Sequence, residues 1–201
     1  MTHRSFTVHF IDPSSRSRAE MARRTLDIGY HCEVYGDFGE LAIHPPRSGI
    51  ILVRDEALSD EIGALFQRLE SLGIWLPLIV LGQNPSPAEI VAAIKAGALD
   101  YLTLPIESDQ LFRAIRRLEP EAEEYAEARR RVFEARNRIG NLSGREREVL
   151  DWLSEGSSNK VIARQLDISP RTVEIHRANM MAKLGAHHPA DAVRLKIEAR
   201  V

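Results

Sequence analysis

The sequence contains a single cysteine, Cys32, among 201 residues, and it lacks any long apolar run. One thiol can form neither an internal disulfide nor a thiolate metal cluster. The most apolar stretch, GIWLPLIVLG at 73–82, is interrupted by Pro77 and falls well short of the roughly 18 residues that a membrane span needs. The N-terminal MTHRSFTVHF lacks the apolar core of a secretory signal. We therefore expect a cytoplasmic protein that has no membrane contact, no bound metal and no other cofactor.

A strong charge of either sign is also missing, because the net charge is -2. The charge is unevenly spread, however. Residues 1–119 carry 12 Lys/Arg against 16 Asp/Glu, whereas residues 137–201 carry 11 against 8. An acidic front and a basic end indicate that the C-terminal part meets phosphate. The length and the 44% of hydrophobic residues allow two small domains, each with its own core.

The front of the chain alternates between strand-like and helix-like runs. Apolar or β-rich strands are predicted at 6–11, 31–35, 49–53, 77–81 and 99–103. Helices are predicted at 14–28, with Ala19, Ala22 and Leu26 on one side, at 60–72, at 86–97 behind a Ser86–Glu89 capping box, and from 108 onward. This order predicts an α/β doubly wound sheet of five parallel strands. Its working site then lies beyond the carboxyl ends of the strands.

Residues 107–139 read as one long helix, rich in Ala, Glu and Arg. Its apolar positions are three, four or seven residues apart, namely Leu118, Ala122, Tyr125, Val132 and Ile139. A solvated linker helix and a short dimeric coiled coil both fit this pattern, although Pro120 interrupts it.

The last part of the chain, 139–201, predicts an all-α domain of four short helices. Ser143 and Glu146 form a capping box at the first, and Ser158 opens the second, with Val161, Ile162 and Leu166 inward. Ser169 caps the third, which has Pro170 at its first position. His188-Pro189 starts the fourth.

The third helix, 170–184, has two different faces. Val173, Met180 and Leu184 recur at i, i+7 and i+11, so they line a face that packs inward. A polar outer face on the second of two helices joined by a tight turn is typical of a helix-turn-helix, although a solvated bundle helix is the alternative. The positions expected to face base edges are Arg171, Glu174, Ile175 and Ala178. Those expected near phosphates are Lys160, Thr172, His176, Arg177, Asn179 and Lys183.

The segment LSGREREVLDWLSEGSSNKVIARQLDISPRTVEIHRANMMAKLGA resembles the DNA-binding domain of LuxR-type regulators, and SPRTVEIHRANMMAK is most similar to the FixJ subfamily. The resemblance implies double-stranded DNA as the partner and a homodimer on it. It also implies that the last helix, 189–199, pairs subunits through Ala192, Val193 and Leu195, and that RNA polymerase is a further partner.

The first 119 residues resemble a response-regulator receiver domain with the flavodoxin-like fold, through TVHFID and IKAGALDYLTLPI. Receivers are phosphorylated on an aspartate by a histidine kinase, with Mg²⁺ held by further acids and with a lysine and a Ser/Thr nearby. Few of these residues are present. Pro13, directly after Asp12, occupies the position of the second acid. Leu81 occupies the position of the Ser/Thr, and Leu104, before Pro105, occupies the position of the lysine. Tyr101 matches an aromatic switch position.

The position of the phospho-acceptor is ambiguous. Counting back from Gly63 selects Asp55, whereas counting from Gly49 or Pro77 selects Arg54. If Arg54 points into the pocket, its guanidinium would pair with Asp12 and imitate the charge of the metal. If Asp55 is the acceptor, Mg²⁺ is required.

These patterns predict a sequence-specific DNA-binding transcription regulator of the two-component type, and not an enzyme. We expect a receiver-like domain at 1–119, a helical linker at 120–138 that continues the last receiver helix, and a helix-turn-helix domain at 139–201. The main hypothesis is a degenerate receiver that conventional phosphorylation does not switch. The alternatives are a conventional regulator phosphorylated on Asp55 and a receiver that acts mainly as a protein-interaction module.

Overall fold

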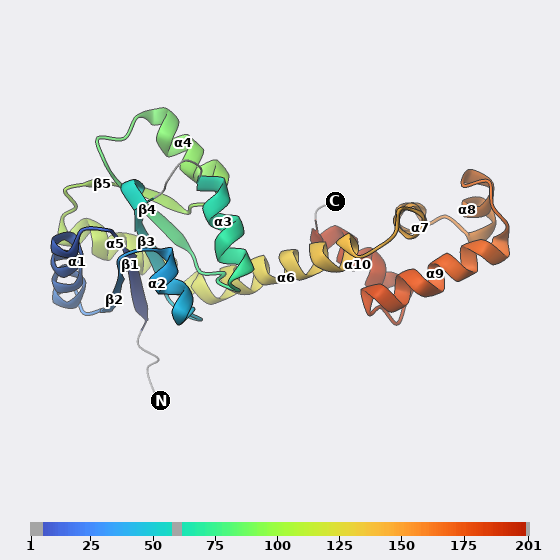
Figure 1. Cartoon of the computed structure of the whole chain (residues 1–201), viewed down its shortest axis with the longest axis horizontal. Coiled ribbons are helices and arrows are strands. Elements are labelled where there is room, and N and C mark those ends of the chain that lie inside the picture. The colour runs from blue at the N-terminus through green and yellow to red at the C-terminus, as the bar shows by residue number, and fades with distance from the viewer. Residues whose placement is uncertain (1–5, 58–61, 200–201) are drawn as a thin grey trace. The chain divides into compact units, whose positions relative to one another are not determined.

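Five parallel strands form the centre of the first part of the chain (Figure 1). The structure is a computed structural model that describes residues 6–57 and 62–199. The strands are β1 (Thr7–Ile11), β2 (His31–Tyr35), β3 (Ile50–Arg54), β4 (Leu78–Gln83) and β5 (Asp100–Leu104), in the order β2-β1-β3-β4-β5. This order confirms the predicted doubly wound sheet, whose switch point lies between β1 and β3. Each predicted strand lies within two residues of an observed one.

Helices cover both faces of this sheet (Figure 1). They are α1 (Ser15–Asp27), α2 (Phe38–Ile43), α3 (Ile62–Ser71), α4 (Pro87–Ala96) and α5 (Ser108–Leu118). Side chains of α1 and α5, such as Met21 and Ile115, pack on one face with Phe10 and Leu52. Side chains of α2, α3 and α4 pack on the other face. Their partners in the sheet are the strand residues whose side chains point to that face, such as Val53. The alternation of side chains along each strand produces these two cores.

Two helices of the first part, α1 and α2, differ from the sequence prediction. The inward face of α1 contains Met21 and Thr25, whereas Leu26 is 70% exposed. Helix α2 was not predicted, because it has only six residues; it is capped by Asp37, whose side chain accepts a hydrogen bond from the Glu40 amide at 2.9 Å. The predicted start of the next helix, at 60, lies outside the described residues.

The predicted long helix at 107–139 is instead made of three segments. Helix α5 ends at Leu118, a 3-10 turn η2 (Glu119–Glu121) follows, and α6 spans Ala122–Gly140. Pro120 lies in the turn, because proline has no amide hydrogen to continue the α-helical ladder. The chain divides into two compact units within α6, the first ending at Ala128 and the second beginning at Arg129.

The second unit is an all-α domain, as predicted. Its helices after α6 are α7 (Gly144–Ser154), α8 (Asn159–Gln165), α9 (Pro170–Leu184) and α10 (Pro189–Ala199). The Ser143–Glu146 capping box and the Ser169 cap are both present. Val161, predicted to lie inward, is 39% exposed, whereas Ile162 is fully buried. The short α8 therefore buries a narrower strip than its apolar residues suggested. None of the described helices is long and apolar enough to cross a membrane.

The end of α6 is part of the core of the second unit. Ala135 is fully buried there and Ile139 is 6% exposed. The Arg136 side chain donates a hydrogen bond to the Ala199 carbonyl at 3.0 Å, near the end of α10, and Arg138 donates to the Leu184 carbonyl at 3.3 Å. The packing of this unit therefore extends before residue 139, where sequence analysis had set the domain boundary.

We expect a fragment of residues 139–201 to be less stable than a fragment of residues 129–201 by about 1–3 kcal/mol. The shorter fragment loses the buried Ala135 side chain and the hydrogen bond from Arg136. Urea unfolding of both fragments, followed by the fluorescence of Trp152, measures the difference. Arg136→Ala in the longer fragment isolates the share of the hydrogen bond. Equal midpoints for the two fragments would show that α6 contributes nothing to this core.

Candidate functional site

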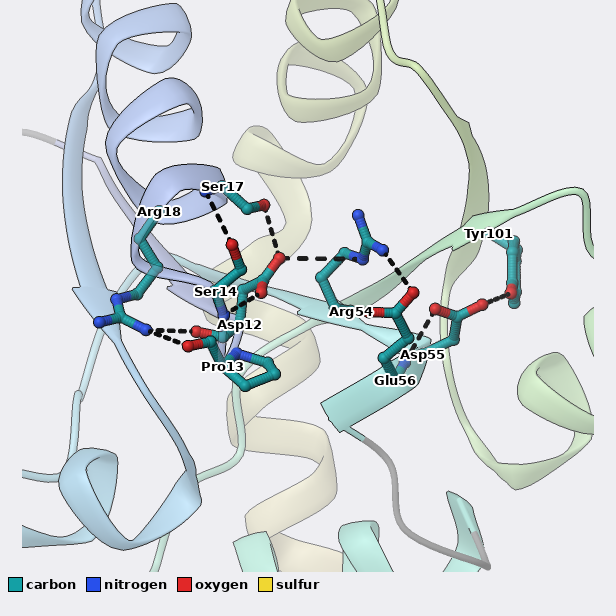
Figure 2. Close-up of polar contacts among 9 residues, drawn as sticks. All are labelled: Asp12, Pro13, Ser14, Ser17, Arg18, Arg54, Asp55, Glu56 and Tyr101. Carbon is teal, nitrogen blue, oxygen red and sulfur yellow. Dashed lines mark hydrogen bonds and ion pairs between the residues drawn. The ribbon is translucent and has the colours of Figure 1, made fainter.

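Asp12 lies directly after β1 and is 2% exposed. Its Oδ1 accepts a hydrogen bond from the Ser14 amide at 2.7 Å, and its Oδ2 accepts one from the Ser17 hydroxyl at 2.6 Å (Figure 2). Arg18 donates to the carbonyls of Asp12 and Pro13 at 2.7 and 3.0 Å. Both carboxylate oxygens therefore accept hydrogen bonds from residues at the start of α1.

Arg54 is the last residue of β3 and pairs in register with Leu81 of β4. Its Nε lies 3.8 Å from Asp12 Oδ2, and its Nη2 donates to Glu56 Oε1 at 2.9 Å (Figure 2). The side chain is only 15% exposed, and the buried Nε has no hydrogen-bond partner within 3.5 Å. A guanidinium cation thus lies between two carboxylates at the carboxyl end of the central strand.

Asp55 follows the strand, begins the 3-10 turn η1 (Asp55–Ala57) and points the other way. Its Oδ1 accepts from the Glu56 amide at 2.8 Å, and its Oδ2 accepts from the Tyr101 hydroxyl at 3.1 Å (Figure 2). Burial, together with the negative charge of Asp55, raises the pKa of Tyr101 to about 12. The tyrosine is therefore neutral at pH 7, and its hydroxyl donates a hydrogen bond to Asp55.

Gly82 of β4 makes room for this contact. A Cβ atom at this position would overlap both the Tyr101 hydroxyl and the Asp55 carboxylate. The hydrogen bond between Tyr101 and Asp55 therefore crosses β4 at the one residue type without a side chain. No local pattern in the sequence indicates this role, because the three residues meet only across the sheet.

We expect Gly82→Ala to destabilise the first unit by about 1–3 kcal/mol, because the methyl group forces Tyr101 or Asp55 to move. Urea unfolding followed at Trp75, in a Trp152→Phe background, reports this unit alone. In a Tyr101→Phe background the same change should cost less, since the overlapping hydroxyl is gone. An equal cost in both backgrounds would contradict the proposed crossing of β4.

The predicted pocket residues point in different directions. The described residues contain no group of three or more His, Cys, Asp or Glu side chains placed to hold a metal ion. Asp12 points to α1 and to Arg54, while Asp55 points to Tyr101. Leu81 is fully buried, and Leu104, which precedes Pro105 through a cis peptide bond, packs partly buried against the same core. Neither leucine offers a group that binds a phosphoryl oxygen.

In the second unit, α9 has one buried and one exposed face, as predicted. Val173, Met180 and Leu184 are fully buried. The expected base-facing residues are all exposed: Arg171, Glu174, Ile175 (52% exposed) and Ala178. Arg171 lies 3.6 Å from Glu174 in an exposed i,i+3 ion pair. This outer stripe is therefore accessible from the surface of the unit.

The residues expected near phosphates differ in their surroundings. Lys160 and Asn179 are exposed, and His176 is half-buried. The Thr172 hydroxyl lies 2.8 Å from that of Ser169 at the helix cap. Arg177 donates to Asn159 Oδ1 of α8 at 2.8 Å and so joins the two helices of the helix-turn-helix.

Lys183 has a partner that the sequence pattern does not indicate. Its Nζ lies 2.7 Å from Oε2 of Glu146, whose side chain is 6% exposed. The hydrogen bond from Lys183, followed by the one from the Ser143 amide, holds the pKa of Glu146 below its ordinary value. The capping box had identified Glu146, but no local signal connects residues that are 37 positions apart. Lys183 therefore anchors α9 to the start of α7.

The last helix is also more buried than expected. Ala192 is fully buried in the core of the second unit, and Val193 and Leu195 pack partly buried against it. Ala192 therefore cannot contact a second subunit while this core is intact. A large exposed hydrophobic residue of α10 is Ile197, which is 71% exposed.

Known proteins share this arrangement. Residues 140–196 match the bacterial regulatory proteins of the luxR family. The chain is 36% identical over 197 residues to the transcriptional regulatory protein FixJ of Rhizobium meliloti, covering 96% of this chain and 95% of FixJ. It is 30% identical over 197 residues to the response regulator protein TodT of Pseudomonas putida, covering 97% and 87%. Full-length FixJ from B. japonicum matches in structure with a TM-score of 0.54 at 29% identity, covering 99% and 98%.

The sheet and the helix-turn-helix thus define a DNA-binding response-regulator transcription factor. The chain belongs to the family of FixJ-like response regulators with a luxR-type DNA-binding domain. These relatives are named as regulators rather than as enzymes.

Proposed function

We propose that the receiver of this regulator is not switched by conventional Mg²⁺-dependent phosphorylation of an aspartate. The observation that carries the proposal is the position of Arg54, which pairs with Leu81 across the sheet and lies 3.8 Å from Asp12. Counting from Gly49 and from Pro77 assigns the acceptor position to this same residue.

The charge at the pocket supports this proposal. A divalent cation in a receiver neutralises the phosphoryl oxygens and is itself held by carboxylates. Here the guanidinium of Arg54 already forms ion pairs with both Asp12 and Glu56. A metal ion placed near these carboxylates would face a fixed positive charge. In this proposal Arg54 supplies the positive charge that the metal ion would otherwise supply, but it cannot accept a phosphoryl group.

We also propose that the outer stripe of α9 reads base edges in the major groove. Arg171 suits the two acceptors of guanine, Glu174 suits the amino group of cytosine, and Ile175 and Ala178 suit thymine methyl groups. The residues that lie near the flanking phosphates in this proposal are Lys160, Thr172, His176, Arg177, Asn179 and Lys183. Two copies of the chain would then read two half-sites as a homodimer, in the cytoplasm and together with RNA polymerase.

Asp55 is the basis of the second candidate function. Its side chain is only partly buried, and it lies at the same edge of the sheet. A histidine kinase would then phosphorylate it, and the hydrogen bond from Tyr101 would have to break. A third candidate, a receiver that acts mainly by binding another protein, rests on the acidic charge of residues 1–119.

The first test is the molar mass of the full-length protein by light scattering, with and without Mg²⁺ and beryllofluoride, which mimics an aspartyl phosphate. We expect no change in mass, because no group of described side chains is placed to hold Mg²⁺ beside an acceptor aspartate. Asp55→Asn is the matched control, since it removes the second candidate acceptor without changing the size of the side chain. A monomer that becomes a dimer in the wild type, but not in Asp55→Asn, would overturn the proposal.

A further inference from the structure

A hollow in the second unit lies away from the proposed DNA-reading stripe. It has a volume of about 390 Å³ and is formed by the end of α6, by α7 and by α10. Its lining residues are Arg136, Ile139, Gly140, Arg147, Leu150, Asp151 and Lys196. None of them belongs to α8 or α9, the two helices of the helix-turn-helix. The volume lies at the lower end of the range of about 300–1,000 Å³ that is usual for small-molecule sites.

The side chains that line this hollow carry an excess of positive charge. Lys196 and Asp151 neutralise each other, because their side chains are 2.7 Å apart, and Lys196 also donates to the Ser154 hydroxyl at 2.9 Å. Among the described residues, the Arg136 side chain forms one hydrogen bond, which its Nε donates to the Ala199 carbonyl. Within the part of the chain that the structure describes, the exposed Arg147 side chain forms neither a hydrogen bond nor an ion pair. Two guanidinium groups are therefore left to bind an anion.

The floor of the hollow is apolar and has free space. Leu150 is 1% exposed and Ile139 is 6% exposed, and both belong to the hydrophobic core. A Cβ atom on Gly140 would meet no atom within 4 Å apart from its own chain neighbours and the adjacent turns of the helix backbone. A ligand that fills this space must therefore carry an apolar part as well as the anionic group that two arginines bind as a planar fork.

We propose that this hollow binds a small organic carboxylate with a short aliphatic chain. The carboxylate lies between Arg147 and the terminal nitrogens of Arg136, and the chain lies on Ile139, Gly140 and Leu150. Such a ligand contacts α6, α7 and α10 at once, so it holds the end of α6 to the rest of the unit. The DNA-binding unit thereby gains an input that is separate from the receiver pocket.

The probe for this site is hexanoate, titrated into the full-length protein and followed by ¹⁵N–¹H NMR of the Gly140 amide and of the arginine Nε–H groups. Hexan-1-ol has the apolar chain without the charge, and inorganic phosphate has the charge without the chain. We expect saturable shifts with hexanoate and at least tenfold weaker binding of the other two probes. Equal binding of hexanoate and hexan-1-ol, or no saturation by hexanoate below about 50 mM, would refute the proposal.

Variants locate the binding. Arg147→Gln should weaken hexanoate at least tenfold, and Gly140→Leu should abolish its binding by filling the hollow. Arg145→Gln is the matched control, because Arg145 lies in the same helix but pairs with Glu148 outside the hollow. A Cβ atom on Gly140 has open space, and a urea midpoint of Gly140→Leu equal to that of the wild type will show that a loss of binding does not arise from unfolding. Unchanged binding by Arg147→Gln, or displacement of hexanoate by duplex DNA of random sequence, would overturn the proposal, and the second result would assign the arginines to DNA phosphates.

Discussion

Lys183→Met is expected to lower the free energy of unfolding of the DNA-binding unit by about 1–3 kcal/mol. The change leaves the carboxylate of Glu146, which is 6% exposed, without its cationic partner. Breaking a fully buried ion pair costs more, about 3–5 kcal/mol, but Lys183 is itself 42% exposed, so water already screens part of the interaction. Urea unfolding followed at Trp152, in a Trp75→Phe background, measures the loss.

The double variant Lys183→Met/Glu146→Gln is the control for this prediction. Glutamine keeps the capping hydrogen bond to Ser143 and carries no charge, so the double variant should recover part of the stability. If the loss of stability in the double variant equals the sum of the losses in Lys183→Met and Glu146→Gln, the two residues do not interact. The role assigned to Lys183 would then be wrong.

The same pair makes stability depend on pH. Lys183 and the Ser143 amide hold the pKa of Glu146 in the folded protein below its ordinary value of 4.5. The folded state therefore favours the ionised form, and the contribution of the pair is fully present above pH 4.5 and is lost as the pH falls through the lowered pKa. The difference in stability between wild type and Lys183→Met should be constant from pH 7 to about pH 5 and shrink below that. A difference that grows on acidification would contradict this account.

Arg171→Ala is expected to weaken binding to a selected DNA site by about 1–3 kcal/mol and to relax the preference at one base position. The Arg171 side chain is 84% exposed at the start of α9, and its only ion pair, among the residues that the structure describes, is an exposed contact with Glu174. Its removal should therefore leave the stability of the unit nearly unchanged. Competition binding with duplexes that differ at single positions measures both effects.

Lys160→Ala is the matched control for Arg171→Ala. Lys160 is exposed in the first turn of α8, so its loss should weaken specific and random duplexes alike and reduce the salt dependence of binding. Lys183 would be a poorer control, because its substitution also changes the stability of the unit. Equal losses on specific and random DNA for Arg171→Ala would show that this residue contacts phosphate rather than a base.

Local signals in the sequence predicted most of the secondary structure. Buried parallel strands are short apolar runs, and helix starts carry capping residues such as Ser86, Ser143 and Ser169, so both are visible within a few residues. Helix α2 escaped because six residues contain less than two helical turns. The inward face of α1 escaped because Met21 and Thr25 form a weaker apolar pattern than Ala19, Ala22 and Leu26.

The sequence by itself determined the order of the five strands, the doubly wound sheet, the helix-turn-helix and the two faces of α9, because short apolar runs, capping residues and a period of about 3.6 residues mark these elements locally. Only the tertiary structure decided that Arg54 pairs with Leu81 and turns to Asp12 while Asp55 turns to Tyr101. A shift of one residue in strand register exchanges the two faces, and nothing local distinguishes the two registers. The ion pair of Lys183 with Glu146 and the hollow beside Arg147 likewise exist only because the fold brings distant residues together.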